Sequence, residues 1–415
     1  MGKRVAVVGG GYSGIAAAFS LAESGIPVTL FESSKTLGGR ARGFDWKGTR
    51  IDNGQHILLG CYRDTLALIE KTCGIADPFL RFPLELSVDE FHLKPFPIFP
   101  PFDVLFGLLG AKGISFPEKL NAVRFLSKAR SMNLVQDIAV AELLAKEKQQ
   151  GRLTDFLWQP LCVSALNTPI DAASSKVFLA VLKDGLNGRG SDMLIPRVDL
   201  STLFPSGAAK FIEEKGGEIL TSKAVRSIRK SHAGFDLVTD TETLSFSHVV
   251  CAVAPYHLPL LLQALPEVAI PRFDYQPICT IYSQYPEDIH LPKKMTGFSK
   301  GLCHWLFDRS EISGQPGLIA GVISATRPEP DGLAAKVHEE TKNLISDLPD
   351  PLWQKVVMEK RATFSCAVNV ERPQNETPLQ NFHLAGDYTS GPYPATLEAA
   401  VRSGLSCARN ILKSV

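Results

Sequence analysis

A run of glycines near the N-terminus has the spacing that can hold a phosphate group. Val5–Val8 is a short apolar segment, and Gly9, Gly11 and Gly14 follow it as G-x-G-x-x-G. In this pattern the first glycine makes a tight turn, the second lets a pyrophosphate reach the backbone, and the third lets a helix pack closely on a strand. The N-terminus of the helix that follows offers unpaired N–H groups to the phosphates.

An acidic residue ends the segment that we expect to form the next strand. Val28–Phe31 is apolar and strand-like, and Glu32 follows it, 18 positions after Gly14. A carboxylate at this place accepts hydrogen bonds from ribose hydroxyls. Ser13 and Ser33, beside the glycines and the acid, are further candidate ligands. Strand, glycines, helix, strand and acid in register predict a bound dinucleotide.

Motifs at both ends of the chain favour FAD over a nicotinamide cofactor. Gly38-Gly-Arg40 follows the acid closely, and a short apolar segment near the C-terminus ends at Gly386-Asp387. Alone, the second pair reads as an ordinary turn. A flavin dinucleotide is long enough to need both ends of the chain, because its ribitol and ring system extend beyond the adenosine site. Asp387 can accept hydrogen bonds from the ribitol.

The helix expected to start near Ala395 can direct its N-terminus at the pyrimidine edge of the flavin, where negative charge develops on reduction. The candidate ligands on the flavin side are Gly39, Arg40, Gly54, Gln55, His56, Gly386, Asp387, Ala395 and Thr396.

Composition excludes several other classes of protein. The chain has 415 residues, of which 45% are hydrophobic and 21% charged, and a net charge of +1. These values predict a folded protein of two joined domains without a nucleic-acid-binding surface. The eight cysteines and nine histidines show no metal-ligand spacing, so we expect no metal and free thiols in a reducing cytoplasm. The apolar N-terminus reads as a strand, because it is too short for a signal peptide.

The pattern of elements predicts a mixed α/β fold, with a Rossmann-like FAD-binding domain and an interleaved substrate-binding domain of antiparallel sheet and helices. We assign residues 1–60, 201–255 and 371–415 to the FAD-binding domain. Residues 61–200, which read as mostly helical, and 256–370, which read as antiparallel strands, form the substrate-binding domain.

One segment is unusually rich in phenylalanine. Pro95–Ala111 holds four phenylalanines among prolines and leucines, and it is too short and too interrupted to span a membrane. It can pack in the core. Alternatively, it forms an apolar lid or a patch that dips into one leaflet and admits an apolar substrate.

Over its full length the chain resembles the flavin amine oxidase and phytoene desaturase superfamily, and within it the hydroxysqualene dehydroxylases, also described as squalene-associated FAD-dependent desaturases. The motifs that carry this resemblance are Asp52-Asn-Gly-Gln-His56, Phe156–Cys162, Ala165–Pro169, Ser191–Leu200, Trp305–Arg309, Arg361–Phe364, Leu384–Thr389 and Pro394–Leu397.

The resemblance implies that hydroxysqualene loses its hydroxyl group and gains a hydride from reduced FAD, giving squalene for hopanoid synthesis. It also implies that Val225 contacts the adenine through its backbone. The expected partner is this long isoprenoid, with peripheral contact at the inner face of the cytoplasmic membrane. The electron donor is not identified, because the chain has no second nucleotide fingerprint.

His56 and Tyr388 are the candidate acids that assist departure of the hydroxyl group. For His56 the alternative is a structural hydrogen bond within its loop, and for Tyr388 it is a place in the wall of the flavin pocket. Asp52 is expected to brace the loop.

Three other functions stay open at this stage. The first is an FAD-dependent isoprenoid desaturase, the second a flavin amine oxidase, and the third a non-catalytic isoprenoid-binding flavoprotein.

Overall fold

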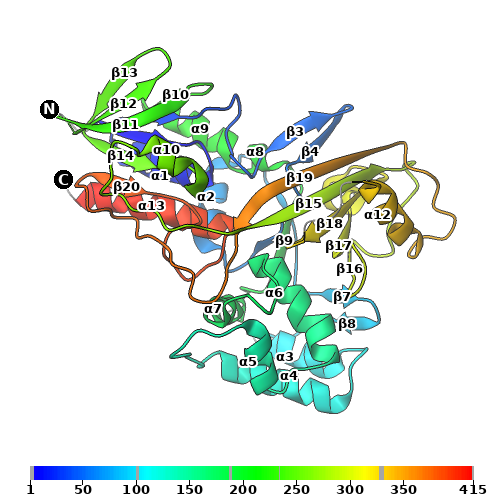
Figure 1. The fold of residues 1–415 in the computed structure, drawn as a ribbon. Helices are drawn as coiled ribbons and strands as arrows, with labels where there is room; N and C mark the ends of the chain where they lie inside the picture. The colour runs from blue at the N-terminus through cyan, green and yellow to red at the C-terminus, as the bar shows by residue number, and fades with distance from the viewer. Residues whose placement is uncertain (1–3, 100–101, 187–188, 233, 327–330, 414–415) are drawn as a thin grey trace.

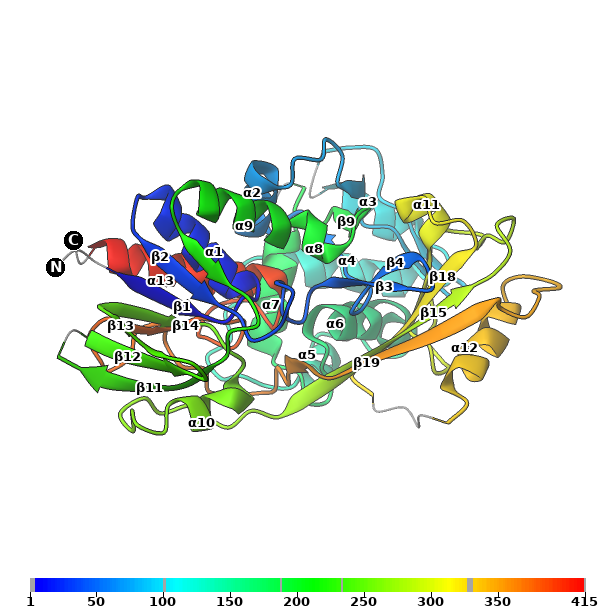
Figure 2. The ribbon, with the colours of Figure 1, turned by 90° about the horizontal axis from the view of Figure 1, so that it is seen from above.

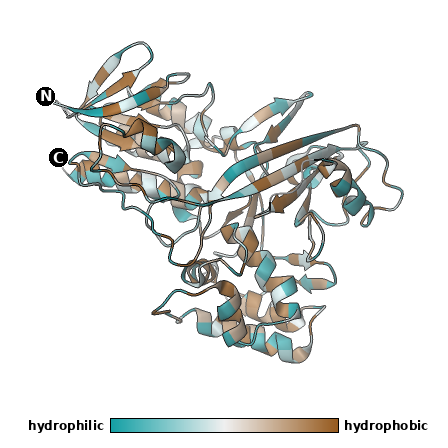
Figure 3. Ribbon diagram, in the orientation of Figure 1, coloured by the Kyte–Doolittle hydropathy of each residue, from teal (hydrophilic) through white to brown (hydrophobic). Residues whose placement is uncertain are grey.

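A five-stranded parallel sheet forms one end of the molecule (Figure 1). The computed structural model describes residues 4–99, 102–186, 189–232, 234–326 and 331–413. The strand order of this sheet is β10-β2-β1-β14-β20. Its strands are β1 (Val5–Val8), β2 (Val28–Phe31), β10 (Glu218–Leu220), β14 (His248–Cys251) and β20 (Phe382–Leu384). Strands β1, β2 and β14 are buried along their whole length and largely apolar (Figure 3), as expected of a parallel sheet covered on both faces.

Helices from distant parts of the chain cover this sheet. Helix α1 (Tyr12–Glu23) packs against α13 (Leu397–Lys413) and α9 (Pro205–Glu214), so the first and last helices of the chain are neighbours. The other face carries an antiparallel three-stranded sheet of β11 (Val225–Ser231), β12 (Gly234–Thr239) and β13 (Thr243–Phe246). The adjoining short helices are α2 (Arg63–Thr72), α8 (Leu200–Leu203), the 3-10 helix η2 (Pro255–His257) and α10 (Leu258–Leu261).

A seven-stranded sheet forms the other end of the molecule (Figure 2). Its order is β19-β15-β18-β17-β16-β7-β8, antiparallel except for the β7–β16 pair. Its strands are β7 (Leu86–Val88), β8 (Phe91–Leu93), β15 (Tyr275–Gln284), β16 (Met295–Gly297), β17 (Trp305–Asp308), β18 (Leu318–Ser324) and β19 (Trp353–Phe364).

The helices and short strands around this sheet complete the fold. The helices are α3 (Phe102–Gly110), α4 (Phe116–Ala129), α5 (Val140–Lys146), the π-helix η1 (Thr154–Trp158), α6 (Gln159–Leu166), α7 (Ser175–Gly185), α11 (Arg309–Ser313) and α12 (Leu333–Lys342). The short strands are the hairpin β3 (Gly43–Trp46) and β4 (Thr49–Asp52), and the sheet of β5 (Leu58–Leu59), β9 (Met193–Pro196) and β6 (Phe79–Phe82).

The mixed α/β fold is confirmed, with one correction to the elements. The segment from 61 to 200 was expected to be mostly helical, but β6, β7, β8 and β9 lie within it. Phe91–Leu93 buries its first and third side chains and exposes the second, which is strand periodicity too short to detect in the sequence.

The parallel sheet draws its strands from the three segments that we assigned to the FAD-binding domain. Strand β5, just inside the boundary at residue 60, pairs instead with β9. The division into two domains stays a proposal.

Candidate active site

The three glycines of the N-terminal fingerprint meet three different surroundings. Gly9 has φ +109°, and a Cβ on it would lie 2.6 Å from the Ala252 carbonyl oxygen. A Cβ on Gly14 would lie 1.9 Å from the carbonyl oxygen of Gly9, so only glycine lets α1 approach β1 this closely. A Cβ on Gly11 would have nothing within 4 Å. The space beside Gly11 is therefore where a ligand can approach the backbone.

The N-terminus of α1 fits a phosphate group. Its N-cap is Gly11, which supplies no capping side chain, and its first turn holds no acidic residue. Ser13 lies in this turn, and its hydroxyl is buried without a hydrogen-bond partner among the described residues. Backbone N–H groups and an unpaired hydroxyl are the groups that a pyrophosphate needs.

Glu32 lies at the carboxyl end of β2, beside the glycine loop. Its Oε2 accepts a hydrogen bond from the Gly10 N–H at 2.7 Å, and its Oε1 accepts one from the Ser34 N–H at 2.7 Å. The Ser33 hydroxyl also donates to Oε1, at 3.2 Å. A carboxylate has further lone pairs, so these bonds leave room for a ribose hydroxyl. Val225 begins β11, two residues after Lys223, whose N–H bonds the Glu32 carbonyl.

The Gly-Gly-Arg motif lies against the glycine fingerprint. Gly38 forms a β-bridge with Gly11, and a Cβ on Gly39 would lie 3.2 Å from the Cα of Gly11. Arg40 follows, and its Nη2 contacts both carboxylate oxygens of Asp387, at 2.8 and 2.7 Å. The structure therefore brings together the two motifs that suggested FAD, although they are separated by almost the whole chain.

Gly54, Gln55 and His56 form the loop between β4 and β5. Gly54 has φ +134°, and its carbonyl oxygen bonds His56 Nδ1 at 2.9 Å. Gln55 Oε1 accepts a hydrogen bond from Arg309 Nη1 at 2.8 Å. Burial lowers the pKa of His56, and the positive charge of Arg40 adds to this effect. At neutral pH His56 is therefore uncharged and braces its own loop.

The start of α13 lies two residues later than expected, at Leu397. The Thr396 hydroxyl accepts a hydrogen bond from the Ala399 N–H at 3.1 Å, so Thr396 caps the helix and Ala395 precedes the cap. The Gly386 N–H bonds the Ser403 hydroxyl of the same helix. The bond to Ser403 holds the Gly386-Asp387 turn against α13.

Tyr388 lies in the core. It is 1% exposed, and its ring packs edge-on against Phe273 at 5.9 Å. Its hydroxyl has no partner among the described residues, and burial raises its pKa. These facts favour the alternative that Tyr388 is part of the wall of the flavin pocket. The catalytic assignments of His56 and Tyr388 both stay predictions.

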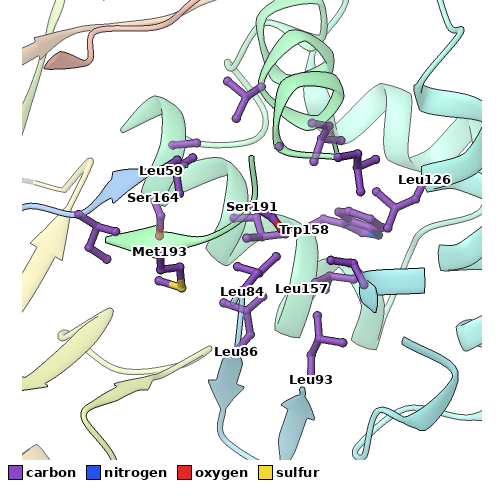
Figure 4. A pocket seen from close by; sticks show the side chains of 18 of the residues that line it. Leu59, Leu84, Leu86, Leu93, Leu126, Leu157, Trp158, Ser164, Ser191 and Met193 are labelled. Atoms are coloured by element: carbon purple, nitrogen blue, oxygen red, sulfur yellow. The ribbon is translucent and has the colours of Figure 1, made fainter. Parts of the chain in front are cut away.

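An apolar cavity begins next to the Gln55–His56 loop (Figure 4). Water-sized spheres can occupy about 170 Å³ of it, and it opens to solvent on one side. Leu84, Leu86 and Leu93 line it on one side and Leu126, Leu157 and Trp158 on another. Ile57 and Leu59, directly after His56, line its near end.

Residues 12–412 match the family model described as flavin containing amine oxidoreductase. The chain belongs to this family. It is accordingly an FAD-dependent oxidoreductase, and we expect the fingerprint, with the open Gly11 and the Ser13 hydroxyl, to bind the dinucleotide.

Relatives of this flavin oxidoreductase match it over nearly the full length. The chain is 29% identical to hydroxysqualene dehydroxylase of Rhodopseudomonas palustris, with 99% of each chain covered, and 27% identical to that of Zymomonas mobilis, with 97% of each covered. In fold it is similar to cyclohexylamine oxidase from Brevibacterium oxydans, with a TM-score of 0.72, 17% identity, and 100% of this chain and 99% of the other covered.

The Asp52 side chain, at the end of β4, ties this strand of the oxidoreductase to the start of α8. It is 4% exposed, and its Oδ1 accepts a hydrogen bond from the Leu200 N–H at 2.8 Å. Burial raises its pKa from 3.8 to about 6, although the Leu200 N–H and the nearby Arg309 act in the opposite direction. The folded protein binds this proton more tightly than the unfolded chain does. The contribution of Asp52 to the free energy of unfolding is therefore complete below pH 3.8 and is lost as the pH rises to about 6.

We expect Asp52→Asn to stabilise the flavoprotein at about pH 8, where Asp52 is a buried charge, by roughly 1–3 kcal/mol. The asparagine oxygen can still accept the Leu200 N–H. At about pH 4 the wild-type carboxyl is protonated in the folded protein, so the difference should shrink. Thermal unfolding of both proteins across this pH range measures it. An equal difference in stability between the two proteins at both pH values would contradict the assignment of Asp52 as a buried charge.

Sequence reasoning missed several residues of the site. Tyr62, Ser191 and Met193 line the cavity, and Arg309 reaches the Gln55 side chain. Ser191 and Arg309 lie within motifs that carry the family resemblance, and this was the signal that could have identified them as site residues. Among the described residues, no three or more His, Cys, Asp or Glu side chains are grouped to hold a metal ion.

Proposed function

We propose that this protein converts hydroxysqualene to squalene by reductive dehydroxylation. The observation that carries the proposal is the apolar cavity that opens beside the cofactor loop, because a thirty-carbon isoprenoid needs a long, dry site. The relatives named hydroxysqualene dehydroxylase, which match from end to end, support the same substrate.

The chemistry of the substrate fits this site. Its hydroxyl group lies beside a double bond, so once that oxygen has gained a proton it can leave as water and produce an allylic cation. Reduced FAD, when bound, supplies the hydride that completes the product. The chain must keep water away from such a cation, and leucines, phenylalanine and tryptophan in the cavity wall do this. The neutral His56 holds its loop at the near end of the cavity.

Reduced protein mixed with hydroxysqualene under anaerobic conditions should form squalene, with up to about one product per bound flavin in a single turnover. Product mass spectrometry measures the yield. With deuterium carried by the reduced cofactor, the label should appear on the former carbinol carbon. Oxidised protein that instead adds double bonds to squalene or phytoene would establish the desaturase alternative. Binding without any redox change would indicate a carrier.

We also propose that a phenylalanine patch brings the enzyme to a membrane, at the inner face of the cytoplasmic membrane. The patch consists of Phe96, Phe99, Phe102 and Phe106, which are 42–68% exposed. Three ring contacts with centroid distances of 5.3–6.4 Å join them into one cluster. Exposed apolar clusters of this kind mark interaction sites.

The patch and the cavity share one helix. Phe102 and Phe106 lie on the exposed side of α3, while Val104 and Leu108 of the same helix line the cavity. A substrate that dissolves in lipid would thus have a short route inward. Exposed Lys94 and Lys112 stand at the two ends of the segment, where cations attract anionic headgroups.

The sequence analysis made two predictions about Pro95–Ala111: that it can form an exposed patch, and that it is too short to span a membrane. The segment is partly exposed, as expected, although residues 100–101 lie outside the described part. Among the described residues, no helix is both long and apolar enough to span a bilayer.

Changing Phe102 and Phe106 to serine should weaken binding to anionic liposomes by about tenfold or more, because each loses an apolar side chain that the bilayer would bury. Co-sedimentation measures the binding, and the FAD content should not change. The control is Leu260→Ser with Leu352→Ser, two leucines exposed elsewhere. Equal binding by both double variants would refute the patch as the membrane contact.

A further inference from the structure

The large cavity contains few polar side chains. Besides two indoles, its polar groups are the hydroxyls of Tyr62, Ser164 and Ser191. The Trp305 Nε1–H donates to the Ser164 hydroxyl at 2.9 Å, and the Trp158 Nε1–H donates to Gln149 Oε1 at 2.9 Å. The hydroxyl of Ser191 forms no hydrogen bond with the described residues, and Ser191 lines the cavity together with Trp158 (Figure 4).

Tyr62 and Ser191 come from two segments that run side by side. Leu59 pairs with Met193 in the β5–β9 ladder. The Gly60 N–H bonds the Asp192 carbonyl at 2.8 Å, and the Cys61 N–H bonds the Gly190 carbonyl at 3.1 Å. These bonds place the two hydroxyl-bearing residues on neighbouring backbones in the wall of one cavity.

This part of the wall is the end next to the cofactor residues. Tyr62 directly precedes α2, whose first turn bonds Glu398 in the first turn of α13. Its ring packs edge-on against Tyr393 at 6.1 Å, which fixes its orientation. The opposite end of the cavity, at α3 and α4, is lined by Val104, Leu108 and Leu126.

We propose that Tyr62 and Ser191 form the subsite that binds the hydroxyl group of the substrate. The inference rests on the proposed function and names the residues that recognise the one polar group of hydroxysqualene. A phenol has one donor and two acceptor sites, so the Tyr62 hydroxyl can bond the oxygen of an alcohol. Burial raises the pKa of Tyr62, so the group stays protonated and able to donate.

The subsite explains how a long hydrocarbon with a single polar group binds at one position in the cavity. An alcohol oxygen bound at Tyr62 places the reacting carbon at the cofactor end, and the two hydrocarbon arms take up the apolar remainder. Squalene lacks this oxygen, so it leaves the buried hydroxyls without a partner. The site should therefore bind the substrate more tightly than the product.

Binding to the oxidised holoprotein, which cannot turn the substrate over, tests the subsite. Fluorescence of the cavity tryptophans Trp158 and Trp305 reports occupancy. Wild type should bind hydroxysqualene about two- to tenfold more tightly than squalene, the effect of one neutral hydrogen bond. In Tyr62→Phe this ratio should approach one, while affinity for squalene stays the same. Ser191→Ala should lower the ratio in the same direction.

The matched control is Tyr285→Phe. Tyr285 is also buried, at 1% exposed against 8% for Tyr62, but its hydroxyl bonds His338 Nδ1 in a separate core cluster, so this variant should keep the wild-type ratio. A wild-type ratio in both Tyr62→Phe and Ser191→Ala would overturn the subsite. If Tyr62→Phe does not fold, the ratio in Ser191→Ala decides. Failure of the reduced wild type to make squalene would refute the proposed function instead, and the binding ratios would still measure the subsite.

Discussion

Gly14→Ala should yield little folded protein, whereas Gly11→Ala should fold normally and lose its FAD. A Cβ at Gly14 would lie 1.9 Å from the Gly9 carbonyl oxygen, and 3.2 Å from the Ala252 Cβ. Gly9 cannot move aside easily, because its N–H bonds the Phe31 carbonyl at 2.8 Å. Overpacking a well-packed core costs about 1–3 kcal/mol, and more when backbone must shift. We expect insoluble protein or a sharply lowered melting temperature.

Gly11 presents the opposite case. A Cβ there meets no protein atom within 4 Å, so the alanine variant should match the wild-type apoprotein in melting temperature and circular dichroism. The methyl group occupies the space where the pyrophosphate approaches the backbone. FAD affinity should fall by about tenfold or more. A Gly11→Ala protein with full flavin, or a stable Gly14→Ala protein, would contradict these roles.

Glu398→Ala should be the most damaging change outside the glycine loop. The Glu398 side chain is fully buried, and its oxygens accept hydrogen bonds from the Asp64 N–H, the Thr65 N–H and the Thr65 hydroxyl. It also pairs with Arg402 Nε at 2.8 Å. It thus ties the start of α13 to the first turn of α2. Removing one partner of such a buried network costs about 3–5 kcal/mol.

Denaturant unfolding of the holoprotein measures this loss. Glu339→Ala serves as the control, because Glu339 pairs with Lys342 on the exposed side of α12 and should leave stability unchanged. We expect the N-terminus of α13 to contact the flavin, so Glu398→Ala should also release FAD more readily. Equal stability of the two variants would show that the tie between α13 and α2 contributes little.

The sequence was most informative where a short local pattern carries the structure. The glycine fingerprint and Glu32 predicted the first strand, turn and helix, because each residue there acts on backbone only a few positions away. The Gly386-Asp387 turn became informative only together with Gly38–Arg40. The structure joins them through the contact between Arg40 and Asp387.

Contacts between distant segments could not be predicted from local sequence patterns. Arg309 bonds Gln55 across 254 positions, and nothing local to either residue indicates the other. Likewise, Tyr62 reads as an ordinary apolar residue at the start of a helix until β5 pairs with β9 and places it in the cavity wall. Strands β6–β8 were missed because three or four residues carry too little periodicity.

The order of strands in the parallel sheet has a consequence for how the enzyme is made. Strand β1 lies between β2 and β14, and β20 joins only at the edge, while α13 packs on α1. During synthesis the first nucleotide-binding strand and helix emerge long before the strands and helix that complete them. A nascent chain therefore exposes apolar surface until β20 and α13 have left the ribosome. Cofactor insertion should then be a late step, and expression with abundant riboflavin should raise the yield of soluble protein by stabilising the completed chain.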